Sequence, residues 1–244
     1  MTIDQAAIDE VFPYNPLREV AFEIRFPMNL RVMPGVWKVQ EELESEYPQL
    51  QREETQLLNT VASTSYVFTN PEQGRAARVG EDRFAIIFTQ YENFEAFSSE
   101  IIKRAQRFCE MFSVERFTRV GLRYVNNIPI SSEASDGGVV QLSRYVQPYI
   151  DLTRTQSHVT QLNQFGLEVI LQRDSCLLGV RSALLKNPQS SLEKVYVIDF
   201  DASVEEESKP EKLPELLQEL HHHIQLEFLS HITEEYKQLM RGQK

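Results

Sequence analysis

The chain is poor in cysteine, with two among 244 residues, Cys109 and Cys176. They stand far apart and form no Cys-x-x-Cys pair, so the sequence gives no support for a zinc site or a redox pair. Both lie among apolar residues, which predicts two buried thiols. No apolar run reaches the length of a membrane-spanning helix, and the acidic N-terminus does not resemble a signal peptide. We therefore expect a cytoplasmic protein that does not enter a membrane.

Positive charge is scarce as well. The sequence contains 25 Lys and Arg against 36 Asp and Glu, which gives a formal net charge of −11. Both halves of the chain share the acidic excess. Proteins that bind nucleic-acid backbones present a positive surface, so the sequence carries no strong nucleic-acid signal, although a local arginine cluster is compatible with this composition.

The common catalytic signatures are missing. The sequence has no Gly-x-Gly-x-x-Gly, no P-loop and no Gly-x-Ser-x-Gly nucleophile motif. His158 has no serine or cysteine near it in a motif context, so a hydrolytic triad has no support. We therefore expect no cofactor, and the sequence favours a protein that is not an enzyme.

What the sequence does contain is apolar alternation, which predicts half-buried strands. The stretch over residues 118–130 alternates in this way, and residues 17–26 repeat its pattern. The matching apolar positions are Val20 with Val120, Phe22 with Leu122, and Ile24 with Tyr124. Phe26 falls opposite the polar Asn126, so the match is incomplete. The two strands nevertheless suggest an internal repeat.

The segments that follow the two strands predict a similar order of elements twice. In the first half, helices are expected over 36–47 and 94–112, the second capped by Asn93, with strands over 57–68, 75–79 and 83–89. In the second half, helices are expected over 139–149 and 213–232, with strands over 157–162, 165–172, 176–184 and 194–200. Residues 202–210 form an acidic loop that we expect to be disordered. Each half thus reads β-α-β-β-β-α, with one extra strand in the second.

This order does not fit a doubly wound sheet, in which nearly every strand is followed by a helix. We expect an α+β fold of two pseudo-symmetric β-α-β-β-β-α halves, residues 1–116 and 117–244, with antiparallel sheets and helices packed on one face. No linker separates the halves, so they should pack as one unit, and their sheets could join into one surface. A cleft at their junction would be a common place for a ligand.

Several short motifs carry a resemblance to a known family. They are Tyr14-Asn15-Pro16-Leu17, Arg119-Val120-Gly121-Leu122-Arg123-Tyr124-Val125-Asn126, Val197-Ile198-Asp199-Phe200-Asp201, and a final helix with Phe228 and Ile232-Thr233-Glu234-Glu235. In these motifs the chain resembles an uncharacterised family of sporadically distributed bacterial proteins of about this size. The resemblance transfers no catalytic residues. The family's patchy distribution is typical of mobile or phage-defence gene clusters, which implies an accessory role beside a partner.

Arg123 is the first candidate for a binding residue. It alternates with the apolar set, so it should lie on the opposite face of the sheet, where Arg119 and Arg181 can join it and Asn126 can orient a ligand. Arginines on a sheet face can clamp a phosphate or a carboxylate, so these four residues form a candidate site for a small anionic ligand. The alternative, which we favour, is a set of salt bridges to Glu19, Glu23 and Glu168.

Two further groups are candidates for metal binding. Asp199 and Asp201 lie two residues apart on a strand and share a face, and such a pair can hold a divalent cation or transfer protons. Solvent-facing aspartates at a strand end are the commoner case. His221, His222 and His223 are consecutive on a helix, so their side chains point about 100° apart and cannot all bind one metal. We expect no metal site and assign these histidines to the polar flank of a packed helix.

Three functions stay open at this point. The first is a non-catalytic cytoplasmic interaction or regulatory protein, an accessory subunit with a protein partner. The second is a sensor that binds a small ligand or nucleotide in a cleft between the halves, with Arg123 and Asn126 as anchors. The third is a metal-dependent hydrolase that uses Asp199 and Asp201. Assembly into a homo-oligomer is compatible with each.

Overall fold

The computed structural model describes residues 12–57, 60–130, 135–136, 139–140, 142–149, 165–186 and 194–243. The strands are β1 (Leu17–Arg25), β2 (Gln49–Leu57), β3 (Thr60–Asn70), β4 (Arg75–Gly80), β5 (Arg83–Phe88), β6 (Arg119–Ile130), β7 (Ser135–Asp136), β8 (Val139–Val140), β9 (Phe165–Arg173), β10 (Cys176–Lys186) and β11 (Lys194–Val204). The helices are α2 (Val36–Leu43), α3 (Phe94–Phe112), α4 (Leu213–His231) and α5 (Glu234–Met240), with single 3-10 turns at Leu142–Arg144 and Pro210–Lys212.

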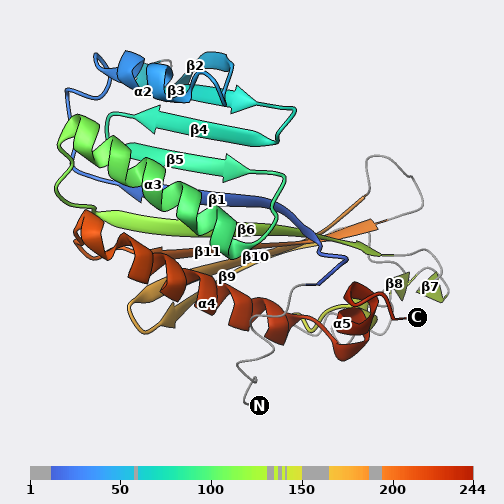
Figure 1. The fold of residues 1–244 in the computed structure, drawn as a ribbon. Coiled ribbons are helices and arrows are strands. Elements are labelled where there is room, and N and C mark those ends of the chain that lie inside the picture. Colours follow the sequence, from blue (N-terminus) through green and yellow to red (C-terminus); the bar gives the residue numbers. More distant parts are fainter. Residues whose placement is uncertain are drawn as a thin grey trace.

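The fold combines these helices with one nine-stranded antiparallel sheet, in the order β2-β3-β4-β5-β1-β6-β11-β10-β9 (Figure 1). The strands that we expected in separate sheets therefore form a single one. β7 and β8 pair with each other outside it. Strands from residues 1–116 occupy one side of the sheet and strands from residues 117–244 the other, and the two sets meet where β1 pairs with β6.

The β1–β6 pair joins the two strands that share an alternation pattern. Phe22 lies opposite Leu122, with Val20 opposite Tyr124 and Ile24 opposite Val120. All six of these side chains are buried. They form one face of the central sheet because alternate strand residues point to the same side. The alternation therefore predicted correctly which side chains face the core.

The helices complete the core on this face. α4 packs against β6, β10 and β11, and α3 lies beside α4; Figure 1 shows both helices in front of the sheet. The aromatic stripe of α3 is buried as predicted, and Phe108 stacks on Phe84 of β5 with ring centroids 4.6 Å apart. Asn93 caps α3 as expected, because its Oδ1 accepts a hydrogen bond from the backbone N–H of Ala96 at 2.8 Å.

Several predicted elements are confirmed, and one strand was missed. β4, β5 and their turn at 81–82 agree with the predicted hairpin. The strand predicted over 57–68 is confirmed as β3 from Thr60 onward, but its start is wrong, because the structure has β2 ending at Leu57 and β3 beginning at Thr60. β2 was overlooked because it lies at the edge of the sheet and reads Gln-Leu-Gln-Arg-Glu-Glu, without apolar alternation. The strand predicted over 157–162 lies outside the described residues.

Two predictions in the second half were also wrong, whereas the predicted final helix is confirmed as α4 to within one residue. Residues 139–149 do not form the expected helix: Val146 forms a bridge with Ile232 beyond the 3-10 turn, so tertiary pairing overrides the local pattern. The expected disordered loop 202–210 begins as strand, because β11 continues to Val204, which pairs with Val120. The final helix ends at His231, and Thr233 then caps α5 through a hydrogen bond from the N–H of Tyr236 to its Oγ1.

The assignment of the three consecutive histidines to a polar flank is wrong for His221, which is buried between α3 and α4. Its ring stacks on Phe94 with centroids 3.7 Å apart, and its Nδ1 lies 2.8 Å from the hydroxyl of Tyr124. Burial lowers the pKa of His221 to about 4, with a smaller effect from the neighbouring His222. The imidazole is therefore neutral in the folded protein at neutral pH.

This buried histidine should make stability depend on pH. In the unfolded chain this histidine has a pKa of about 6.5, whereas in the folded protein its pKa is about 4. Between these two pH values the unfolded chain therefore binds more protons at His221 than the folded protein does. The stabilising contribution is complete above pH 6.5 and is lost as pH falls through this window. We expect His221 to account for a loss of about 2 kcal/mol between pH 7.5 and pH 5.

Urea denaturation of the wild type and His221→Gln at the two pH values measures this effect. The glutamine can keep a hydrogen bond to Tyr124 but cannot be protonated, so the variant should lose less stability on acidification. The same loss in both proteins would show that His221 does not control the pH dependence.

Candidate functional site

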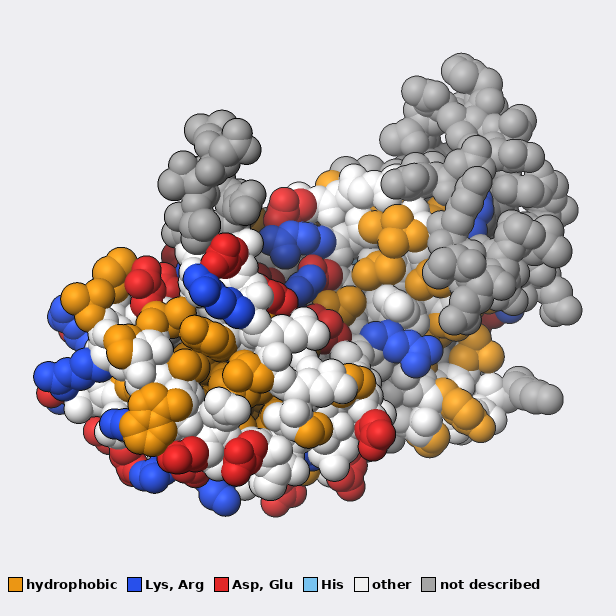
Figure 2. Space-filling model, turned by 90° about the horizontal axis from the view of Figure 1, so that it is seen from above, with side chains coloured by type: hydrophobic (Ala, Val, Ile, Leu, Met, Phe, Trp, Pro, Cys, Tyr) orange, Lys and Arg blue, Asp and Glu red, His pale blue; other side chains and the backbone are white. Residues whose placement is uncertain are grey.

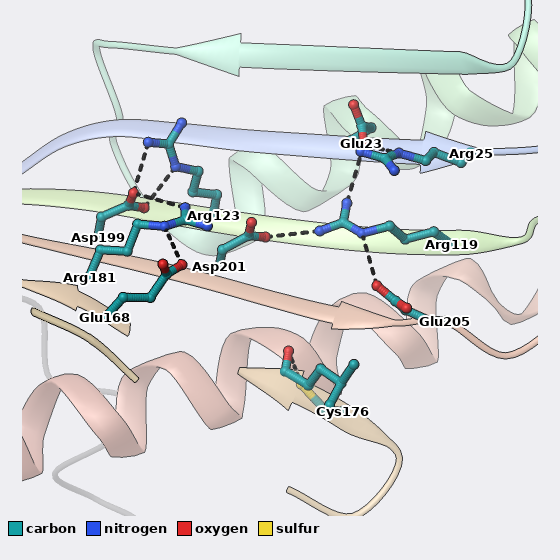
Figure 3. Close-up of polar contacts among 11 residues, drawn as sticks. Glu23, Arg25, Arg119, Arg123, Glu168, Cys176, Arg181, Asp199, Asp201 and Glu205 are labelled. Atoms are coloured by element: carbon teal, nitrogen blue, oxygen red, sulfur yellow. Dashed lines mark hydrogen bonds and ion pairs between the residues drawn. The ribbon is translucent and has the colours of Figure 1, made fainter. Parts of the chain in front are cut away.

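The sheet face that points away from α3 and α4 carries a row of arginines and carboxylates (Figure 3). Arg119 and Arg123 reach this face because they alternate with the buried Val120, Leu122 and Tyr124. Neighbouring strands add residues of both signs in register. We call this set the charged row: Glu19, Glu23, Arg25, Arg119, Arg123, Glu168, Arg181, Asp199, Asp201 and Glu205.

One part of the charged row is centred on Asp199, whose side chain is only 9% exposed. Arg123 donates Nε to one carboxylate oxygen at 2.7 Å and Nη2 to the other at 2.9 Å. Arg181 approaches the same carboxylate at 3.5 Å and also donates to Glu168 at 2.8 Å. The hydrogen bonds from Arg123 satisfy both oxygens of Asp199, as a carboxylate removed from water requires.

A second part is centred on Arg119, whose side chain is 15% exposed. It donates to Asp201 at 3.0 Å and to Glu23 at 3.2 Å, and Glu205 lies 3.8 Å from its Nε. The guanidinium lies across Gly121, where an added Cβ would stand 2.3 Å from Nη1. The glycine in Arg119-Val120-Gly121 therefore leaves the space that the arginine occupies.

The structure brings three of the four proposed ligand-binding residues together. Arg119, Arg123 and Arg181 lie on the same face, whereas Asn126 is buried on the core side and its side chain contacts the carbonyl of Ile198 at 3.5 Å. The favoured salt-bridge interpretation is confirmed for three pairs. They are Arg119 with Glu23, Arg123 with Glu19 at 3.7 Å, and Arg181 with Glu168.

Asp199 and Asp201 share a face, as predicted, but arginines engage both carboxylates. Within the residues that the structure describes, no group of three or more His, Cys, Asp or Glu side chains is placed to hold a metal ion. The two aspartates therefore act as counterions in the charged row. Sequence reasoning did not predict this role, because it depends on how β11 is aligned with β6.

A cavity of about 1010 Å³ lies where the two sequence halves meet, between the end of α3 and residues 207–212. Cys109, Glu110, Arg116 and Lys209 are among its lining residues, but Arg123 and Asn126 are not. The expected cleft and the expected ligand anchors are thus in different places. Both cysteines are buried, as predicted, and burial raises the pKa of Cys109 to about 12, so its thiol is a weak nucleophile at neutral pH.

Sequence reasoning missed three exposed large apolar side chains, two in the loop that follows β1 and one in the first turn of α2. Met28, Leu30 and Trp37 are 65%, 76% and 52% exposed. We call residues 28–37 the 28–37 surface. Figure 2 shows hydrophobic side chains gathered among acidic and basic ones in the view onto the end of the molecule that carries α2 and β2. The available signal was Trp37, which lies beside the buried stripe of α2 but not in it.

The backbone of the 28–37 surface is fixed to the rest of the fold. The N–H of Asn29 donates to the carbonyl of Glu81 at 2.8 Å, and its side-chain amide donates to the carbonyl of Phe112 at 2.8 Å. Gly35 lies so close to the ring of Phe112 that an added Cβ would stand 2.8 Å from Cε1. The exposed side chains therefore project from an anchored segment.

Comparisons of this chain with family models and with curated proteins gave no match. No helix within the described residues combines the length and the apolar character needed to cross a membrane.

The arrangement around Asp199 predicts a moderate structural role for Arg123. Arg123→Ala leaves Asp199 with Arg181 alone, at 3.5 Å. Because Arg123 is 42% exposed and Asp199 is 9% exposed, the loss should fall between those of a surface pair and a buried pair, at about 2 kcal/mol. Chemical denaturation measures this free energy of unfolding.

The matched control is Arg25→Ala, which removes a more exposed arginine bonded to Glu23 and should cost about 0–1 kcal/mol. The double variant Arg123→Ala/Asp199→Ala should lose less stability than the sum of the single variants, because the two residues interact directly. Equal losses for Arg25 and Arg123, with additive behaviour of the double variant, would contradict the structural role.

Proposed function

We propose that the protein is a non-catalytic interaction or regulatory protein that acts as an accessory subunit of a protein partner. The observation that carries this proposal is the 28–37 surface, where three large apolar side chains are more than half exposed on an anchored segment. Single exposed apolar residues are ordinary, but a group of them is typical of an interface.

The chemistry of this surface suits protein recognition. Tryptophan and methionine are enriched at protein interfaces, and tryptophan often contributes much of the binding energy. Trp37 and Met111 line a recess of about 360 Å³ together with four charged residues, Lys38, Glu41, Glu42 and Arg107. A partner side chain that combines an apolar stem with a polar end would suit this lining. The anchored backbone lowers the entropy lost on binding.

We also propose that the scaffold arose from two related halves, residues 1–116 and 117–244, each with its main helix on the same face. The register of β1 against β6 supports this. Val20 pairs with Tyr124 and Val120 pairs with Ile24, as a two-fold axis through the Phe22–Leu122 pair requires if Val20 corresponds to Val120 and Ile24 to Tyr124. β5 flanks β1 as β11 flanks β6. The halves thus pack as one unit, and the 28–37 surface belongs to the first of them.

The family resemblance suggests the setting of the partner. Accessory proteins of mobile or phage-defence clusters act with products of neighbouring genes, so we propose a cytoplasmic partner of this kind. The assignment rests on association with a family, whereas the 28–37 surface supplies the physical basis for binding.

A small-ligand or nucleotide sensor is the second candidate. Arg123 and Arg181 are 42% and 50% exposed, so an anion could reach their guanidinium groups. Carboxylates outnumber arginines in the charged row, however, and would repel such a ligand. The third candidate, a hydrolase that uses Asp199 and Asp201, would require a metal to displace arginines from both carboxylates. We therefore prefer the interaction protein.

Substitutions in the 28–37 surface should weaken partner binding without unfolding the protein. For Trp37→Ala combined with Leu30→Ser we expect at least a tenfold loss of affinity, because removing a central tryptophan often costs about 2 kcal/mol or more. The melting temperature should change little, since both side chains are more than half exposed. Affinity purification from the native host, followed by titration of the purified partner, measures the effect.

Leu239→Ser is the matched control, because Leu239 is an exposed apolar residue on α5, outside this surface. It should bind the partner as the wild type does. Partner binding that survives the Trp37/Leu30 variant but is lost in the control would refute the proposed surface.

A further inference from the structure

The strands at the two ends of the sheet differ in how they are protected from pairing. β2 forms one edge and carries Arg52, Glu53 and Glu54, charges that discourage another strand from adding to it. β9 forms the other edge with the sequence Phe-Gly-Leu-Glu-Val-Ile-Leu-Gln-Arg, which has no proline or lysine. Among the strands that the structure describes, β10 alone pairs with β9.

β9 also exposes apolar side chains on both of its faces. Leu167, Val169 and Leu171 are half-buried on the side toward the core. Ile170 points to the opposite face and is 69% exposed. Apolar side chains on an edge strand without proline or lysine leave that edge open to pairing with a further strand. Glu168 and Arg173 are the charged residues of β9, and between them lie three consecutive apolar residues.

The sequence of β9 is self-complementary when two copies run antiparallel. With a two-fold axis through Ile170, this residue faces its own copy, Val169 faces Leu171, and Glu168 faces Gln172. These pairs place apolar side chains together and give the carboxylate an amide partner. An axis through Glu168 would instead place two carboxylates opposite each other, which is unfavourable.

From these features we infer that β9 is a homodimerisation edge, and that two copies of the chain pair their β9 strands antiparallel about Ile170 to form one continuous sheet. The interface joins the backbone N–H and C=O groups of residues 167–173 that point away from β10 in both copies, groups that no other described strand pairs with. Figure 1 places β9 and β2 at opposite ends of the sheet, so dimerisation does not involve α2 or the 28–37 surface. This inference is independent of the proposed partner binding.

The first test is the oligomeric state of the full chain, measured by sedimentation velocity and light scattering. The wild type should have twice the 28.4 kDa mass of the chain. Ile170→Lys places two ammonium groups opposite each other at the axis and should raise the dimer dissociation constant at least tenfold. Far-UV circular dichroism should be unchanged, because Ile170 is 69% exposed.

Leu30→Lys introduces the same charge at an exposed apolar residue of the 28–37 surface and should leave the dimer intact. A wild type that is monomeric at about 100 μM would overturn the inference. A dimer that survives Ile170→Lys, or one that Leu30→Lys dissociates, would overturn it as well.

The second test measures the register by cross-linking. Paired residues in antiparallel strands have Cα atoms about 4.5–5.5 Å apart, within reach of a disulfide, so Ile170→Cys should form a covalent dimer on mild oxidation. The wild type should not, because Cys109 and Cys176 are buried. Gln172→Cys should not cross-link either. In this register residue 172 faces residue 168 of the other copy, so the two introduced cysteines are four residues out of alignment, about 13 Å apart. Cross-linking by Gln172→Cys but not Ile170→Cys would refute this pairing.

Discussion

The pairing of β1 with β6 is the constraint on which the rest of the structure depends. Every other strand of the sheet is placed outward from this pair, through β5 on one side and β11 on the other. The apolar face around Phe22 and Leu122 fixes the register, because a shift of one residue would exchange the two faces of a strand. Such a shift on β6 would turn Arg123 toward α4 and expose Leu122. Core packing therefore also determines where the charged row lies.

The charged row supplies the counterions that poorly exposed carboxylates in this sheet require. Asp199 lies on β11, an interior strand of the sheet, with its side chain 9% exposed, where an unpaired carboxylate would be costly. Arg123 reaches both of its oxygens from the neighbouring strand, and Arg119 links Glu23 of β1 to Asp201 of β11. The row thus connects the strands that meet at the centre of the sheet, and its arginines have their main partners within the protein.

Local pattern predicted much of this fold, and long-range pairing accounts for what it missed. Val20 and Val120 were assigned to the core from alternation alone, and α3 from its aromatic stripe and Asn93. β2 escaped because an edge strand does not need apolar alternation. The Arg123–Asp199 pair escaped because 76 residues separate its members, and only the register of β6 against β11 brings them together. The 28–37 surface depends on a tertiary anchor at Asn29 that no local pattern reveals.

The 28–37 surface and the β9 edge lie in different parts of the molecule, and this has a consequence for binding. α2, which ends the 28–37 surface, packs near β3 toward one end of the sheet, whereas β9 forms the other end. Two chains joined at β9 would extend the sheet to about 80 Å at about 4.8 Å per strand, with one 28–37 surface toward each end. One partner molecule would have to span this distance to engage both surfaces, so the dimer is suited to bridging two partner molecules or one elongated, repetitive partner. Simultaneous engagement of two sites on the same partner would raise the apparent affinity without any new contact, and separating the chains at Ile170 would remove that gain while leaving each single site intact.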